Sequence, residues 1–294
     1  MKVSTTTLLL AAALGVAAHP SGHAHKHMHR SAVEKRTEFY MPKKPAPPAP
    51  VKAAPTSVAA PPAPTSTTHA QPPASSPSGS GYGIGASAYT SFCGGKSSKR
   101  ATAAEIAYKG NVGAPGNYGC NMMLIQSNIA NQYDSTMTFT NAGSKTQKCA
   151  CWNKIGPDNG INGFFLGNQV FTFNLAPGGK QNVACDANTQ GGCACGPGEL
   201  SLSLGQFADT WVEFDFANES NKGWSGADAS CLVAAKYGLT IQGLKVCASN
   251  ICSTINAGGT GDNAYLAGME DADGVGLNLP AGKVNLQVTI DYQG

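Results

Sequence analysis

Histidine is missing from the part of the chain that we expect to fold. All six histidines lie at or before His69, and residues 81–294 contain none. A domain without imidazole cannot run a Ser-His-Asp or Cys-His mechanism, and it cannot hold a metal ion through histidine. We therefore expect a domain with no cofactor and no metal ion.

Charge and long apolar runs are also scarce. Charged residues make up 13% of the chain, about half of the usual fraction. Residues 81–294 carry twelve Lys and Arg against fifteen Asp and Glu, so this part is mildly acidic although the whole chain has a net charge of +3. Nucleic-acid binding needs a basic surface, and a membrane-spanning helix needs about 20 apolar residues. We expect neither a nucleic acid nor a membrane as partner.

Proline and cysteine divide the chain. Residues 1–80 hold 13 of the 18 prolines, whereas residues 81–294 hold all ten cysteines and 33 of the 36 glycines. We predict four segments, namely a signal peptide (1–18), a His-rich propeptide (19–36), a disordered Pro/Ala/Ser/Thr-rich spacer (37–80) and a Cys-rich β domain (81–294).

The first two segments predict a secreted, extracellular protein. A short apolar run, Leu8–Leu14, precedes small residues at the predicted cleavage site before His19, which is typical of a signal peptide. The dibasic pair Lys35-Arg36 ends the propeptide. Two alternatives remain open for this segment. Its alternating histidines are also suited to binding copper or zinc, and His19 would be the first ligand of a copper monooxygenase.

Residues 81–294 have the pattern of an all-β protein. Short alternating or apolar segments are separated by Gly, Pro and Asn, which is typical of a sandwich or barrel. Only Asp228–Lys236 has a helical pattern. A Pro-Gly-Gly turn after Leu175 predicts a strand, a turn and a second strand. The predicted strands are Glu105–Tyr108, Met122–Gln126, Thr136–Thr140, Cys149–Lys154, Gly163–Leu166, Gln169–Leu175, Asn182–Asp186, Glu199–Leu204, Thr210–Phe216, Thr240–Cys247 and Lys283–Tyr292.

Ten cysteines behind a signal peptide predict disulfides. Cys247 and Cys252 are the best local pair, and the remaining pairing is left open. Two Cys-x-Cys motifs place their cysteines on one face of a strand; disulfides are favoured there over a thiolate metal cluster. The expected disulfide cysteines are Cys93, Cys120, Cys149, Cys151, Cys185, Cys193, Cys195, Cys231, Cys247 and Cys252.

Three carboxylates are the candidates for catalysis. Glycoside hydrolysis needs two carboxyl groups on opposite sides of the scissile bond, and Glu213, Asp215 and Asp228 are the set we nominate. On an alternating strand, Glu213 and Asp215 share a face with Trp211, while Val212 and the following phenylalanines share the other. That face is either an ordinary solvent-facing one or an acidic cleft.

Other side chains indicate binding or modification. Trp152, Trp211 and Trp224 could stack on sugar rings if exposed, and Trp224 stands in a glycine-rich loop. Asn218 begins an Asn-Glu-Ser sequon for N-glycosylation. The acidic stretch 270–274 lacks a complete calcium-loop spacing, and a solvated turn is favoured there.

Several motifs resemble the Asp f 4-like family of secreted fungal allergens. They are YKGNVG (108–113), WNKIGPD (152–158), EFDF (213–216), KGWSG (222–226) and LAG (266–268), together with the final strand. The resemblance implies a secreted fungal allergen, and it implies host IgE as a partner.

A second resemblance concerns the fold. The Pro-Gly turn, the Cys/Gly-rich stretch and the strand over 210–216 resemble thaumatin-like proteins, which are disulfide-rich β-sandwiches with an acidic cleft. By position, Glu213 and Asp228 would correspond to two of the cleft acids. We therefore expect a disulfide-rich β-sandwich, with a thaumatin-like arrangement as one form of it, behind a disordered N-terminal region.

These observations favour a non-enzymatic secreted protein that is associated with the cell wall or a host surface and binds β-glucan. The alternatives are an acidic-cleft β-glucanase and a secreted effector that acts on a host protein.

Overall fold

The computed structural model describes residues 83–95 and 110–294. The predicted signal peptide, propeptide and spacer lie outside these residues, as does the predicted strand Glu105–Tyr108. Within the described ranges, no helix is both long and apolar enough to cross a membrane.

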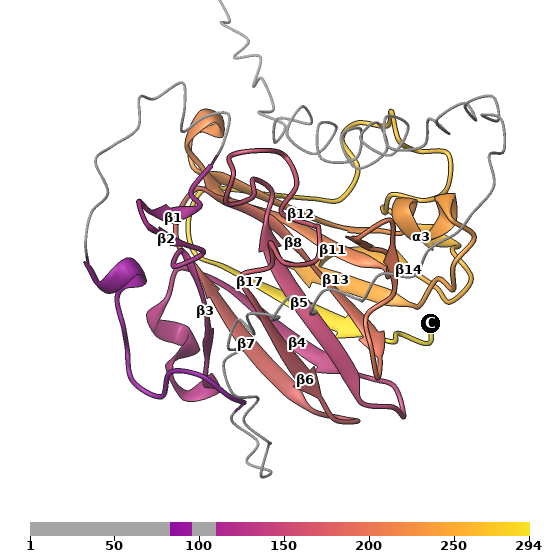
Figure 1. Ribbon diagram of the computed structural model, residues 1–294, viewed down its shortest axis with the longest axis horizontal. Coiled ribbons are helices and arrows are strands. Elements are labelled where there is room, and N and C mark those ends of the chain that lie inside the picture. Colours follow the sequence, from indigo (N-terminus) through magenta and orange to yellow (C-terminus); the bar gives the residue numbers. More distant parts are fainter. Residues whose placement is uncertain (1–82, 96–109) are drawn as a thin grey trace, which may run out of the picture.

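Two large β-sheets make up most of the domain, and the strand axes of the two sheets are roughly aligned (Figure 1). One sheet has six strands in the order β16 (Leu277–Leu279), β12 (Trp224–Ser230), β11 (Trp211–Asn218), β8 (Thr189–Pro197), β5 (Gln147–Asn153) and β6 (Phe171–Leu175). The other has seven in the order β15 (Gly261–Asp262), β14 (Ile251–Ile255), β13 (Leu244–Ala248), β17 (Val284–Ile290), β4 (Ser135–Asn141), β7 (Lys180–Cys185) and β3 (Met122–Ile125). All neighbours are antiparallel except β17 and β4. The predicted all-β, disulfide-rich sandwich is confirmed.

Smaller elements surround the sheets. Two short hairpins pair β1 (Gly113–Ala114) with β2 (Asn117–Tyr118) and β9 (Leu202–Ser203) with β10 (Gln206–Phe207). The helices are η1 (Phe92–Gly95), η2 (Ser127–Gln132), η3 (Glu219–Asn221) and α3 (Leu232–Lys236). In Figure 1, α3 lies on the opposite side of the molecule from η1.

The main core lies between the two sheets. Val212, Phe214 and Phe216 of β11 point into it, as their alternation predicts, and they share one cluster with Phe139 of β4 and Val288 of β17. Removal of these apolar surfaces from water is the main force that holds the sheets together.

A second apolar layer covers part of the outer face of the six-stranded sheet. Trp152 stacks on Phe207 with ring centroids 5.1 Å apart, and it meets Trp211 edge to face at the same distance. Phe164 and Val233 complete this cluster. Both faces of the sheet are therefore buried in this region.

The predicted strands agree with the structure where alternation is clear, as in β3, β4, β5, β11 and β17. The prediction missed β8, β12, β14 and β16. The sequence of β8, TQGGCACGP, has the composition of a turn. Two other segments were wrong. Gly163–Leu166 forms only a single bridge, from Phe165 to Gln206. The helical pattern over Asp228–Lys236 includes the end of β12, and α3 begins only at Leu232.

The predicted strand-turn-strand after residue 169 joins the two sheets. Its turn is closed by Gly179 N–H, which donates to Ala176 O at 2.8 Å. However, β6 pairs with β5 in one sheet, and β7 pairs with β4 and β3 in the other. The segment is therefore a corner between layers rather than a paired hairpin.

Four disulfides cross-link the domain: Cys93–Cys120, Cys149–Cys195, Cys151–Cys193 and Cys247–Cys252. The local prediction for Cys247 and Cys252 is confirmed. The two Cys-x-Cys motifs bond to each other, because the antiparallel register of β5 and β8 places their cysteines opposite one another. The prediction that all ten cysteines pair is wrong for Cys185 and Cys231, which are buried free thiols.

Candidate functional site

The outer face of the six-stranded sheet carries the candidate carboxylates in two neighbouring rows. In the first row, Asp215 of β11 lies opposite Gln190 of β8, and Lys154 follows the end of β5 beside Gln190. The second row runs from Trp152 across Gly192 to Glu213 and on to Asp228.

Glu213 and Asp228 are direct cross-strand partners in β11 and β12. The structure thus brings the two proposed acids together, with Asp215 two residues further along β11. However, Glu213 is 0% exposed, Asp228 1% and Asp215 3%. Both expectations for this face, a solvent-facing surface and an open acidic cleft, are wrong, because other segments cover it.

Residues 263–276 supply part of that cover. Tyr265 N–H donates to Ala229 O at 2.9 Å and so holds the segment against β12. Gly276 packs so closely that a Cβ there would lie 2.7 Å from Asp228 Cβ. Burial raises the pKa of Tyr265 well above its usual value, and the nearby Asp228 and Glu213 raise it further.

Lys154 is a buried lysine in the first row. Its Nζ donates to Gln190 Oε1 at 2.5 Å, and its backbone N–H donates to Gln190 O at 2.8 Å. Burial lowers the pKa of the Lys154 ammonium to about 8, although Asp215 opposes this shift. Lys154 belongs to the WNKIGPD motif. The pattern of apolar and polar residues in this motif gives no sign that Lys154 is buried beside Gln190.

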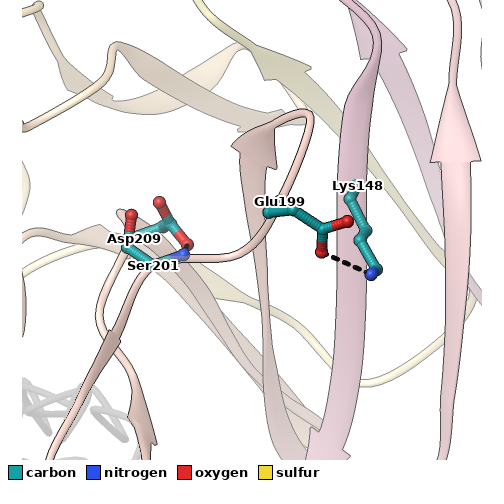
Figure 2. Close-up of polar contacts among 4 residues, drawn as sticks. All are labelled: Lys148, Glu199, Ser201 and Asp209. Atoms are coloured by element: carbon teal, nitrogen blue, oxygen red, sulfur yellow. Dashed lines mark hydrogen bonds and ion pairs between the residues drawn. The ribbon is translucent and has the colours of Figure 1, made fainter.

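Asp209 is a second buried carboxyl that the sequence analysis did not single out. Its Oδ2 accepts a hydrogen bond from Ser201 N–H at 2.7 Å. Burial raises the pKa of Asp209 to about 6, although the hydrogen bonds from Ser201 lower it. Figure 2 shows this pair beside the exposed ion pair between Lys148 Nζ and Glu199 Oε2, which are 2.6 Å apart.

Of the three candidate tryptophans, two cannot bind sugar from solvent. Trp152 and Trp211 are buried in the second apolar layer, so their assignment as surface platforms is wrong. Trp224 is partly exposed at the start of β12. It follows Lys222 and Gly223, whose positive φ values of 56° and 81° form the turn out of η3.

The sequon residue Asn218 is buried, and its amide is occupied. Asn218 Oδ1 accepts hydrogen bonds from Asn221 N–H at 3.1 Å and Ser220 Oγ at 2.5 Å, so it caps η3. Its Nδ2 donates to Asp215 Oδ2 at 2.5 Å. The expected glycosylation site is therefore incompatible with the folded structure, because Nδ2 is the atom that would carry a glycan.

Residues 83–95 and 110–294 bring together no group of three His, Cys, Asp or Glu side chains placed to hold an ion.

Two solved structures resemble the domain at low TM-scores. The protein elicitor MoHrip2 from Magnaporthe oryzae has a TM-score of 0.32 and 12% identity, and the match covers 54% of this chain and 99% of that one. The thaumatin-like xylanase inhibitor TLXI has a TM-score of 0.31 and 13% identity, with 52% of this chain and 97% of that one covered. We draw no conclusion from likenesses at these TM-scores.

Sequence comparison is more informative. Allergen Asp f 4 from Aspergillus fumigatus is 37% identical over 193 residues, which cover 64% of this chain and 59% of that protein. The chain thus spans less than two thirds of that relative. The family model of the Allergen Asp f 4-like domain matches residues 120–290, from the cysteine before β3 to the end of β17. Because this match spans more than half of the chain and nearly the whole sandwich, the chain belongs to the Asp f 4-like allergen family.

Proposed function

We propose that this chain is a secreted, non-enzymatic protein that associates with the cell wall or a host surface by binding β-glucan around Trp224. The observation that carries the proposal is the position of Trp224, which keeps part of its indole in solvent. Indole rings are large apolar surfaces that stack on sugar rings. Lys222, next to it in the turn, is exposed and supplies a hydrogen-bond donor for hydroxyl groups.

Secretion is supported by the disulfides and by the predicted signal peptide. Four disulfides form readily in oxidising compartments and rarely in the cytosol. The relative from Aspergillus fumigatus is named an allergen, and host IgE remains an expected partner on that ground.

The non-enzymatic assignment rests on the burial of Glu213 and Asp228. A glycoside hydrolase must bring two carboxyl groups to the glycosidic bond from opposite sides. Here both carboxylates lie on one sheet face beneath the segment that contains Tyr265. A polysaccharide would have to displace that segment before either acid could reach it.

A pull-down with insoluble β-1,3-glucan tests the binding proposal, with chitin as a second polymer. We expect the wild-type chain to be retained on glucan, and Trp224→Ala to bind about tenfold more weakly, the equivalent of ~1.4 kcal/mol. Tyr89→Ala is the matched control, because Tyr89 is 56% exposed and stacks on Tyr133 rather than lying near β12.

Three outcomes would contradict the proposal. Equal retention of Trp224→Ala and wild type would remove Trp224 as the binding residue. Release of reducing sugar from laminarin-type glucan by the wild type, lost in Glu213→Gln, would replace the binding function with the hydrolase alternative. Retention on a host protein but not on glucan would favour the effector alternative.

A further inference from the structure

The strands β5 and β8 are cross-linked in a regular series. Cys149 bonds to Cys195 and Cys151 bonds to Cys193, each at a position where the antiparallel register places the two residues opposite one another. The same register pairs Asn153 with Gly191. Lys154 and Gln190 follow next and are joined by the backbone hydrogen bond from Lys154 N–H to Gln190 O, and their side chains lie on the opposite sheet face from the four cysteines.

We propose that Lys154 and Gln190 form an autocatalytic isopeptide bond between Nζ and Cδ, which adds a third covalent link between the start of β8 and the end of β5. Three observations support it, and they concern the distance between the reacting groups, their protonation and the neighbouring carboxylate.

The reacting groups are already in contact. Lys154 Nζ lies 2.5 Å from Gln190 Oε1. Because a C=O bond is about 1.2 Å long, Nζ is at most about 3.7 Å from Cδ. This is close to the ~3–3.5 Å of a near-attack geometry, and fixed positioning of this kind replaces much of the entropic barrier of a bimolecular reaction.

Burial favours the reactive form of the amine. Lys154 is 4% exposed and Gln190 3%. Desolvation lowers the pKa of Lys154 to about 8, so about one amine in ten is neutral and nucleophilic at pH 7. Gln190 Nε2 is buried and has no hydrogen-bond partner among the described residues. Its departure would remove a buried polar group that lacks a partner, and such groups are destabilising.

Asp215 is the carboxylate that we assign to proton transfer. It lies directly opposite Gln190 in β11, and its charge acts on Lys154. Its Oδ2 is oriented by Asn218 Nδ2 at 2.5 Å. In the balanced step, the Nζ lone pair attacks Cδ, Nζ gives one proton to Asp215, and Asp215 passes it to Nε2. The Cδ–Nε2 bond breaks and ammonia leaves, with no oxidant or reductant involved.

Peptide mapping of the secreted chain tests this inference. The peptides concerned lie far from the N-terminus, so removal of the predicted signal peptide and propeptide does not affect the result. The chain is fully reduced, alkylated and digested with trypsin. We expect a branched peptide that joins residues 149–180 to 181–222 and is lighter than its two parts by one ammonia, because trypsin does not cleave after an acylated lysine. Separate linear peptides 149–154 and 181–222, with no branched species, would overturn the proposal.

Variants separate the chemistry from folding. Lys154→Arg keeps a positive donor but has no nucleophilic amine, so the branched peptide should be lost completely. Asp215→Asn should reduce its yield several-fold, and an undiminished yield would overturn the role of Asp215. In Gln190→Glu, a branched peptide lighter than its two parts by one water instead of one ammonia supports the assignment of Nε2 as the leaving group, and loss of ammonia in that variant would overturn it. The same four disulfides, mapped in the unreduced digest, show that each variant has folded.

Discussion

Asn218 Nδ2 donates a hydrogen bond to Asp215 Oδ2 at 2.5 Å within the folded domain, although Asn218 begins an N-glycosylation sequon. A glycan would replace one of the two hydrogens of Nδ2 and would have to leave a site that is 1% exposed. Glycosylation of the sequon needs an accessible Nδ2, whereas the folded domain buries this atom.

We therefore predict that the folded, secreted chain carries no glycan at Asn218. The tryptic peptide that contains residue 218, whether or not it is cross-linked, should carry no glycan mass after expression in a glycosylating host. Ser220→Ala destroys the sequon and serves as control, and it should leave this result unchanged. A glycosylated peptide from natively folded protein would contradict the prediction.

Asn218→Ala should lower the free energy of unfolding by about 2 kcal/mol. Loss of the cap of η3 costs about 1 kcal/mol, and the buried Asp215 loses one donor, which costs about 1 kcal/mol or more. Urea denaturation measures the change. Glu219→Ala, an exposed residue in the same turn, is the control and should change stability by less than about 0.5 kcal/mol.

The two disulfides between β5 and β8 should act non-additively. Their cysteines are 46 and 42 residues apart, and loops of this length correspond to about 4 kcal/mol each in the chain-entropy model. Either bond alone still closes the loop, so removal of Cys151–Cys193 should cost much less than this value. Removal of both should cost more than the sum of the single losses.

Denaturant titrations of the two double-alanine variants and of the fourfold variant measure this coupling. The variant without Cys247–Cys252, which closes a loop of only 5 residues, should lose about 2 kcal/mol in any background. Strictly additive losses for the β5–β8 pair would show that the two bonds do not restrict the same loop.

Free thiols provide a test of the cysteine assignment. Cys185 and Cys231 are buried, and burial raises the pKa of both thiols. Since the thiolate is the reactive form, neither should react with a thiol reagent in the native protein. After denaturation without reductant, two thiols per chain should react. A count of zero would mean that these two cysteines are paired.

The contribution of Asp209 to the free energy of unfolding should be larger at acidic pH than at neutral pH. Its folded pKa of about 6 lies above the ordinary value of 3.8, so the folded state binds this proton more tightly than the unfolded state. This stabilisation is fully present below about pH 4 and is lost as the pH rises through 6. The change in the free energy of unfolding that it causes is about 3 kcal/mol.

Asp209→Asn should flatten this part of the pH profile in denaturation experiments between pH 4 and 7. Glu199→Gln is the control, because Glu199 is 82% exposed in its ion pair with Lys148 and such pairs contribute about 0–1 kcal/mol. An unchanged slope in Asp209→Asn would show that another group binds the proton.

The sequence predicted the features that depend on local pattern. Alternation in β11 placed Val212, Phe214 and Phe216 on one face, and the structure has them in the core. The separation of Cys247 and Cys252 identified their bond, because a short loop allows few alternatives. Local pattern failed for β8, whose glycines and cysteines resemble a turn but pair along the centre of a sheet.

What the sequence by itself determined is therefore the fold class, the inward face of the clearest strands and the presence of a disulfide framework. Only the tertiary structure decided the surroundings of the other face. The meeting of Glu213 with Asp228, the contact of Lys154 with Gln190 and the burial of Trp152 depend on the register between strands and on the segments that cover the sheet. Period-two alternation separates the two faces of a strand, but it does not tell whether the second face meets water or protein.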